Sequence, residues 1–426
     1  MTTVKTNSFK DNKSDWILLI SVWLFYVSMM VNKSIYTAEI IEIMNYFNVD
    51  KSTASYATTA YYFTYGFMQL VFAKLVSKIN VRKYLTVMIL LSGVCTFLVG
   101  STTSLWQSCL LLGLNGIFHA GVWPGCLSVV SRYISPNMQT TANGVLSVGF
   151  AAGFILSYIT SALFIQISTW KLTFWLFGIL TIPATLFFER MYRKAEKSTV
   201  VSETQKSQKQ TVNKEFEHLK HTLIQKLLRI FFLLACLLAF LANVVYYGIS
   251  NWVPTLMYDV FNMPSSISTL LSVLVPIVGI FGPFIAIWLG KRHNVFKVCI
   301  IHTVIYSIFI LALLFFYRIN FLFSLVASVL SLMVIRGVTN TLGIALVLKA
   351  RNIYNPAVFA SIINAMASLG ASVSPPVTGA ILDNFGRPTY YIVLLVIAMI
   401  WLLLAVLCLK ISRRLRVLRK TVLMLD

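Results

Sequence analysis

The sequence predicts an all-α membrane protein with twelve transmembrane helices in two pseudo-symmetric six-helix halves. Two observations predict this fold class. Of the 426 residues, 58% are hydrophobic and 11% are charged, whereas soluble domains hold about 45–50% apolar and about 25% charged residues. Apolar runs long enough to cross a bilayer also recur along the chain, and one long polar stretch divides them into two equal sets.

Charged or turn residues bound these runs and define the predicted organisation. The predicted helices are 16–37, 53–77, 84–101, 105–131, 139–166, 170–189, 227–258, 266–290, 296–317, 319–348, 356–382 and 389–411. The predicted domains are a cytoplasmic N-terminal tail (1–15), the first half (16–189), a polar linker (190–226), the second half (227–411) and a basic tail (412–426). The linker is expected to be a solvated tether. The first span lacks a small-residue cleavage site, so we expect it to remain in the mature protein.

Basic residues set the predicted orientation. Clusters of Lys and Arg follow the second, eighth, tenth and last helices, and Arg132 follows the fourth. The alternate connections hold few basic residues: Lys51, Lys171, Arg318 and Arg387. The positive-inside rule therefore predicts an inner (cytoplasmic) membrane protein with both termini cytoplasmic. Because the net charge of +22 lies in short clusters between apolar spans, the expected partner is the lipid bilayer and not nucleic acid. We expect a monomer.

Several function classes are excluded by what the sequence lacks. It has no Gly-rich phosphate loop with a following Lys-Ser/Thr, no soluble ATPase domain and no catalytic constellation, so we expect neither an enzyme nor a primary pump. The six cysteines lie in apolar spans without metal-binding spacing, and no metal, cofactor or disulfide is expected. All 13 acidic residues fall in tails, loops or helix ends. This placement argues against proton-coupled efflux of cationic drugs.

A single charge, Arg336, interrupts the apolar stretch Ile319–Leu348 near its middle. A guanidinium at that depth costs about 2.5–3.5 kcal/mol on insertion scales, so its default interpretation is functional. We favour Arg336 as a residue of the substrate cavity, and the alternative is a structural arginine bonded to carbonyls of a broken helix. Lys33 lies near the outer end of the first helix. It is either a second cation of the same site or a lysine that snorkels to the headgroups.

Other candidates are polar or aromatic side chains within the spans. Tyr65 and Tyr246 can donate hydrogen bonds to an anion, although most tyrosines of membrane proteins pack or lie at interfaces. His119 is the natural group if a proton is coupled, and a packing histidine is an equal alternative. Asn340 either contributes to the cavity or joins helices. Pro124, after Trp123, is expected to bend the fourth helix and to serve as a gate.

The two halves also share a short sequence pattern at corresponding positions. Ala73-x-x-x-Ser77-Lys78 follows the second helix, and Ala286-x-x-x-Gly290-Lys291 follows the eighth, as an internal 6+6 repeat predicts. Together with twelve spans and a central basic loop, this pattern resembles the major facilitator superfamily of secondary transporters and implies the major facilitator fold. The family's loop motif, Gly-x-x-x-Asp-Arg, would place its gating positions at Ser77, Lys78 and Arg82. Its acidic member is missing here.

Within that superfamily, the sequence is most similar to the organophosphate:phosphate antiporters, which exchange glycerol-3-phosphate or hexose phosphate. The similarity touches most helices. It rests on Tyr65-Gly66-Phe67, Gly121-x-Trp123-Pro124, Tyr247-Gly248-Ile249-x-x-Trp252-x-Pro254-Thr255, and Leu369-Gly370-x-Ser372-Val373 through Gly379, Asp383 and Phe385-Gly386.

The resemblance also shows where this chain departs from those exchangers, which hold phosphate between two arginines. Lys33 stands at the position of the first arginine, and Tyr246 stands where the second would be. A family histidine of the fifth helix corresponds to Gly153, whereas Arg336 occupies the place of a tyrosine in the tenth. The second cation has thus moved from the seventh helix to the tenth. Because lysine lacks the bidentate fork that suits phosphate, the implied substrate class widens to small organic anions, phosphorylated ones included.

These observations predict a secondary transporter that binds a small organic anion between Lys33 and Arg336 and works by alternating access. Antiport and proton symport are both open, and the sequence does not determine the substrate or the direction of transport. One alternative is a drug or metabolite efflux pump of the same fold. Another is a membrane sensor that binds ligand without moving it, as one branch similar to these exchangers does.

Overall fold

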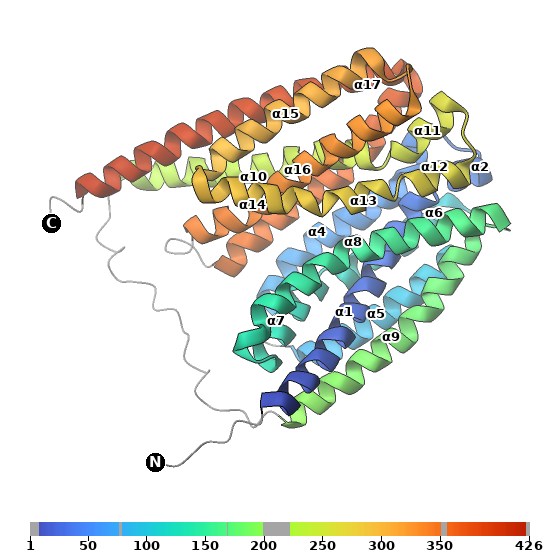
Figure 1. Ribbon diagram of the computed structural model, residues 1–426, viewed down its shortest axis with the longest axis horizontal. Coiled ribbons are helices and arrows are strands. Elements are labelled where there is room, and N and C mark those ends of the chain that lie inside the picture. Colours follow the sequence, from blue (N-terminus) through green and yellow to red (C-terminus); the bar gives the residue numbers. More distant parts are fainter. Residues whose placement is uncertain (1–7, 76–78, 168, 199–221, 351–355, 423–426) are drawn as a thin grey trace.

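The computed structural model describes residues 8–75, 79–167, 169–198, 222–350 and 356–422, and every regular element in these ranges is an α-helix (Figure 1). For residues 8–12, 73–74, 222–229, 338–350, 356–359 and 415–422 the description covers the backbone alone. Nine helical segments of the described residues are long and apolar enough to cross a membrane. One of these, residues 360–414, covers most of the predicted span 356–382 and all of the predicted span 389–411.

The first half contains seven longer helical segments and two short ones. Its long segments are α1 (Ser8–Ala38), α4 (Tyr56–Leu75), α5 (Val81–Val99), α6 (Leu105–His119), α7 (Val122–Tyr133), α8 (Pro136–Ile167) and α9 (Lys171–Ser198). Two short helices, α2 (Ile40–Phe47) and α3 (Lys51–Ala54), connect α1 to α4. Asp50 caps α3 by accepting from the Thr53 amide at 2.7 Å, and Asn80 caps α5 through the Lys83 amide at 3.1 Å. α1 packs against α8 and α9, and α4 packs against α6.

The second half continues the all-helical pattern. Its elements are α10 (Thr222–Ser250), α11 (Val253–Phe261), α12 (Ser265–Leu271), α13 (Leu274–Gly279), α14 (Phe281–Arg292), α15 (Val295–Phe316), α16 (Phe321–Ala350) and α17 (Pro356–Val422). α17 is two helices joined at Gly386, whose φ of 75° lies in the region that favours glycine. The predicted eleventh and twelfth helices therefore meet without a loop.

Within the described residues, each of the twelve predicted ranges is mainly helical, and the predicted fold class is confirmed. Helix also enters both ends of the predicted linker, since α9 runs to Ser198 and α10 begins at Thr222. The expected bend at Pro124 coincides with a helix break, and a second proline follows another break. Pro124 follows the break between α6 and α7, and Pro254 follows the break between α10 and α11. Pro375 and Pro376 lie inside the continuous first part of α17.

The two halves meet mainly at one end of the bundle. In Figure 1 their ribbons converge where α2, α11 and α12 lie and diverge toward the end that carries both chain termini. The contacts between halves follow the same pattern: α17 packs against α3 and α4, α8 against α12 and α13, and α2 against α11. We call this end the closed end and the other the terminus end.

Candidate functional site

Lys33 extends from α1 into a group of tyrosines on α4. Its Nζ lies 5.0 Å from the ring centroid of Tyr62, 5.3 Å from that of Tyr65 and 5.8 Å from that of Tyr61. These three rings lie on neighbouring positions of consecutive helical turns, so α4 presents them together. Among the described residues, no carboxylate forms an ion pair with Lys33. The aromatic faces stabilise the ammonium without neutralising its charge.

Arg336 approaches the same place from the second half. Its Cζ lies 3.9 Å from the ring centroid of Phe150 on α8 and 5.4 Å from that of Tyr246 on α10. The Lys33 Nζ lies 6.0 Å from the same Phe150 centroid, so the two cationic groups are within about 10 Å of each other. At that separation two like charges repel by about 2 kcal/mol at an effective dielectric constant of about 20.

The aromatic side chains around these cations come from both halves. Tyr62 of the first half and Tyr247 of the second have ring centroids 4.7 Å apart, and Tyr247 contacts Tyr246 edge-on at 5.1 Å. We call the two cations with these rings the central site. It consists of Lys33, Arg336, Tyr61, Tyr62, Tyr65, Phe150, Tyr246 and Tyr247. Because it spans the contact between halves, a bound ligand would touch both.

His119 lies behind the central site. It is fully buried, and its Nδ1 and Nε2 form hydrogen bonds with the hydroxyls of Tyr61 at 2.9 Å and Ser92 at 2.6 Å. Asn32 donates to Ser92 at 3.3 Å and to Thr181 at 3.1 Å, which extends the polar network across α1, α5 and α9. His119 therefore reaches the central site through Tyr61, whose ring lies beside Lys33.

The remaining predicted positions have different surroundings. Arg82 on α5 forms ion pairs with Glu189 at 3.6 Å and Glu196 at 3.5 Å, both on α9, so it fastens two helices of the first half. Trp123 lies at the start of α7, and its ring centroid is 5.1 Å from that of Tyr26 on α1. Ser77, Lys78 and the side chain of Asn340 lie outside the described residues.

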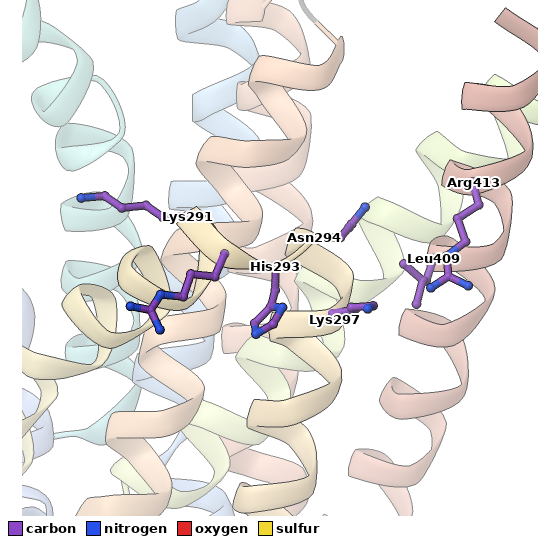
Figure 2. Close-up of a pocket in the computed structure, with 7 residues that line it drawn as sticks. Lys291, His293, Asn294, Lys297, Leu409 and Arg413 are labelled. Carbon is purple, nitrogen blue, oxygen red and sulfur yellow. The ribbon is translucent and has the colours of Figure 1, made fainter. Parts of the chain in front are cut away.

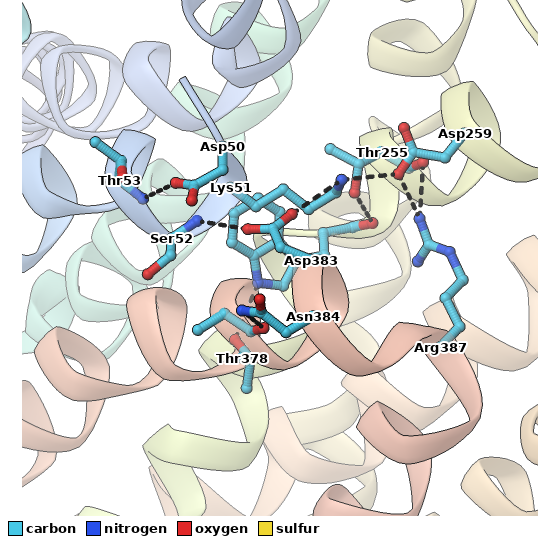
Figure 3. Close-up of polar contacts among 12 residues, drawn as sticks. Asp50, Lys51, Ser52, Thr53, Thr255, Asp259, Thr378, Asp383, Asn384 and Arg387 are labelled. Atoms are coloured by element: carbon cyan, nitrogen blue, oxygen red, sulfur yellow. Dashed lines mark hydrogen bonds and ion pairs between the residues drawn. The ribbon is translucent and has the colours of Figure 1, made fainter. Parts of the chain in front are cut away.

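A polar interlock joins the halves at the closed end, and sequence reasoning missed it (Figure 3). The Lys51 ammonium from the first half lies 3.3 Å from Asp259 and 3.4 Å from Asp383, both of the second half. Arg387 contacts Asp259 at 3.0 Å, and the Ser52 amide donates to Asp383 at 3.1 Å. The sequence signal for these ion pairs is the presence of isolated basic residues, Lys51 and Arg387, in connections that otherwise hold few. The positive-inside rule uses their small number only to assign topology.

Small side chains of α17 let the halves approach closely beside this interlock. Thr59 donates to the carbonyl of Ser372 at 2.8 Å, and Ser52 donates to the carbonyl of Pro376 at 3.1 Å. A Cβ at Gly379 would lie 2.8 Å from the Ser52 amide nitrogen, which shows how near the two backbones are. Ser372, Pro376 and Gly379 follow helical spacing and therefore form one face. The Gly379 to Asp383 part of the predicted motif thus serves the contact between halves.

A separate basic pocket of about 410 Å³ lies at the terminus end of the second half (Figure 2). Its lining comes from the turn between α14 and α15 and from the end of α17: Lys291, Arg292, His293, Asn294, Lys297, Leu409 and Arg413. None of these residues belongs to the central site. The described residues contain no group of His, Cys, Asp or Glu that could hold a metal ion.

Comparisons with known proteins agree with this architecture. A family model described as the Major Facilitator Superfamily matches residues 18–352. Among curated proteins, the membrane sensor protein UhpC of Salmonella typhimurium is 28% identical over 118 residues, which cover 28% of this chain and 27% of that protein. A probable hexose phosphate transport protein of Chlamydia pneumoniae is 22% identical over 42% of this chain and 40% of that protein. The benzoate transport protein of Acinetobacter baylyi is 22% identical over 66% of this chain and 65% of that protein.

The matched segments thus span from about a quarter to just under two thirds of these three relatives. Solved structures match over nearly the whole chain. A bacterial homologue of the human lysosomal transporter Spinster, inward-facing and unoccupied, has a TM-score of 0.72 at 14% identity and covers 94% of this chain and 98% of that one. The nucleoside transporter NupG has a TM-score of 0.66 at 15% identity, with 94% and 99% coverage. These TM-scores show a shared fold.

Proposed function

Because the chain belongs to the Major Facilitator Superfamily, we propose that it is a secondary transporter that moves a small organic anion by alternating access. Membership makes it a multi-pass membrane protein and not an enzyme. The single observation that carries the proposal is the central site, where Lys33 of one half and Arg336 of the other lie against one ring, that of Phe150.

Electrostatics favours an anion as the ligand of this site. Two cations within about 10 Å repel each other, and a negative charge between them converts that repulsion into two attractions. The ligand would then hold one half to the other, so its binding and the rocking of the halves are coupled. The guanidinium of Arg336 suits the planar fork of a carboxylate or the oxygens of a phosphate.

The aromatic rings further define the substrate class. Tyr61, Tyr62, Tyr65, Phe150, Tyr246 and Tyr247 supply apolar faces and, in the tyrosines, hydroxyl groups. Such walls favour an anion that carries a ring or another flat body, which can stack while its charged group meets the cations. Two of the relatives are named for transport of benzoate and of hexose phosphate, and both of these compounds are anions that carry a ring.

The distribution of the basic clusters predicts which end of the bundle faces the outside of the cell. With both termini cytoplasmic, as the positive-inside rule predicts, the interlock of Lys51 faces the outside. The closed end is then the outer end, and the structure represents an inward-facing conformation. The inward-facing Spinster homologue, whose fold this chain shares, is consistent with this assignment.

The proposal is tested by binding and transport in parallel. Purified protein is screened for thermal stabilisation by aromatic carboxylates and sugar phosphates, and the stabilising compounds are then measured for uptake and counterflow in proteoliposomes. Lys33→Gln and Arg336→Gln should each reduce binding at least tenfold, since each removes a charge-assisted contact worth about 1.5–3 kcal/mol.

Matched controls come from two cations outside the central site. Lys171 lies 4.2 Å from the Tyr46 ring and Arg318 lies 5.3 Å from the Tyr317 ring, so both make similar ring contacts. Lys171→Gln and Arg318→Gln should bind ligand normally. Full binding and transport by both central-site variants would refute the site, whereas stabilisation by cations and not by anions would refute the substrate class.

A sensor is the second candidate, and the UhpC match favours it. A sensor would bind the same anions at the same residues, because the central site does not depend on transport. The distinguishing result is ligand-dependent stabilisation that Lys33→Gln abolishes, together with no counterflow of any stabilising compound.

A further inference from the structure

Glu39 is a buried carboxyl group outside the central site. It lies at the junction of α1 and α2 and is completely shielded from solvent. Its Oε1 accepts a hydrogen bond from the Thr173 hydroxyl at 2.8 Å. In the described part of the chain, its Oε2 is buried without a well-formed hydrogen bond, and the Ser161 hydroxyl lies close enough to stabilise the carboxylate weakly. The sequence had placed Glu39 among helix-end acids, where full burial is not expected.

No cation compensates this carboxyl group within the described residues. α2 contributes Glu42, which has the same charge, and α8 contributes the Ser161 hydroxyl. Lys171, at the start of α9, directs its ammonium to the Tyr46 hydroxyl at 3.0 Å instead. A buried carboxylate without a counter-charge is strongly disfavoured, so the neutral acid is the stable form here.

The acid–base behaviour of Glu39, which lies beyond the first span, follows from this environment. Burial raises the pKa of the Glu39 carboxyl to about 8 from its ordinary value of 4.5. The hydroxyls of Thr173 and Ser161 act in the opposite direction, and the charge of Glu42 adds to the rise. Glu39 in the closed arrangement therefore holds a proton at neutral pH.

The position of Glu39 ties its burial to the contact between halves. The Ala38 carbonyl, one residue before it, accepts a hydrogen bond from Thr269 of α12 at 3.2 Å. Ala38 also packs in one buried cluster with Tyr158 of the first half and Val273 of the second. Separation of the halves at the closed end would remove α12 and Val273 from this place and admit water beside Glu39.

We propose that Glu39 is a proton-binding site that must be loaded from solution before the closed end can form. With the halves apart, the hydrated carboxylate takes a proton from water at this end. Closure then buries the neutral acid, which has a proton on one carboxyl oxygen and the Ser161 and Thr173 hydroxyls beside it. This inference rests on the alternating access of the proposed function, and it adds a proton to the outward-to-inward step.

The sign of the pH dependence follows from linkage. The closed arrangement binds the proton more tightly than the open one, so acidification favours closure and alkalinisation favours opening. Between the ordinary value of 4.5 and the closed-state value of about 8, the ratio of closed to open molecules falls by up to tenfold for each pH unit of increase.

The test measures opening directly and needs no substrate. Spin labels on Asn45→Cys of α2 and Ile267→Cys of α12, both exposed at the closed end, report the distance between halves in full-length protein in liposomes. With the parent sequence, raising the pH from about 6 to about 9 should populate a longer distance. Glu39→Gln should keep the short distance throughout that range. Glu42→Gln, the matched charge-removal control, should still open as the pH rises, with its midpoint at slightly lower pH because the charge that adds to the raised pKa of Glu39 is gone.

A second variant guards against a folding defect in Glu39→Gln. Thr173→Val removes the hydroxyl that lowers the pKa of Glu39, so the midpoint of opening should move to higher pH. A distance independent of pH in the parent, or an unchanged response in Glu39→Gln, would overturn the proposal. Either result is separable from failure of the proposed function, because the labels report opening even if no anion is transported.

Discussion

The ammonium of Lys51 lies 3.4 Å from the carboxylate of Asp383, and this ion pair joins the two halves of the chain at the closed end. Both side chains are mostly buried, with 19% and 16% of their surfaces exposed. Lys51 also reaches Asp259, so one lysine of the first half contacts two carboxylates of the second. Opening this end requires that both contacts break together.

Lys51→Met should therefore shift the protein toward the open arrangement. Loss of a partly buried ion pair of this kind is worth about 1 kcal/mol, which corresponds to roughly a fivefold change in the closed-to-open ratio. The distance between labels on Asn45→Cys and Ile267→Cys measures the change. Asp383→Asn should have less effect in the Lys51→Met background than in the parent, because the pair is already broken. Strictly additive effects would contradict a direct interaction.

Gly379→Ala should also favour opening of the closed end, because the added methyl group would clash with the first half. An added Cβ would lie 2.8 Å from the Ser52 amide nitrogen and 2.9 Å from the Lys51 carbonyl carbon, and backbone atoms cannot move aside like a flexible side chain. The expected result is a longer distance between halves with helix content unchanged, measured by the same labels and by circular dichroism. Gly279→Ala is the matched control, since an added Cβ there has nothing within 4 Å. Equal behaviour of the two variants would show that the Gly379 contact does not limit closure.

The helices and the two candidate cations could be recognised from the sequence for one physical reason. A charge within an apolar span is costly, so Lys33 and Arg336 stand out individually, and hydropathy alone marks the spans around them. Their approach to a single ring, that of Phe150, could not be predicted, because it depends on how α1, α8 and α16 pack.

The ion pairs of the closed end could not be predicted, because charged residues outside an apolar span are not costly and do not stand out in the sequence. Lys51, Asp259 and Asp383 lie at helix ends, where charged residues are ordinary, and their pairing depends on segments far apart in sequence. Glu39 escaped for the same reason. It lies at the junction between α1 and α2, and its burial depends on contact with Thr173 of α9, far away in the sequence.

His119→Ala should reduce both stability and ligand affinity. The substitution leaves the hydroxyls of Tyr61 and Ser92 without their buried partner and creates a cavity, at a cost of about 2–4 kcal/mol in the free energy of unfolding. It also releases the Tyr61 ring beside Lys33. His302→Ala is the matched control, since His302 is buried but bonds to the Val298 carbonyl of its own helix at 2.8 Å.

Thermal unfolding and ligand titration separate these two effects. Both histidine variants should unfold at lower temperature, whereas ligand affinity should fall in His119→Ala alone. An unchanged affinity in His119→Ala would show that Tyr61 holds its position without the histidine.

Phe150→Leu tests the contact that brings the two cations together. The Arg336 Cζ lies over the Phe150 ring, 3.9 Å from its centroid, while an anion would bind to the N–H groups in the plane of the guanidinium. Leucine keeps the apolar character but removes the ring, so Arg336 loses an orienting cation–π contact worth about 0.5–2 kcal/mol. Anion affinity should fall about twofold to thirtyfold, as measured by calorimetric titration with a compound from the stabilisation screen.

Phe154→Leu provides the control for loss of a ring. Phe154 stacks on Phe150 at 4.7 Å, one turn along α8. Its replacement should leave affinity within about twofold of the parent, because the contact of Phe150 with Arg336 remains. Phe150→Tyr should also retain affinity, since the ring face is preserved. Tighter anion binding by Phe150→Leu would mean that the ring competes with the ligand for Arg336, and that the anion must displace Phe150 in order to bridge the two halves.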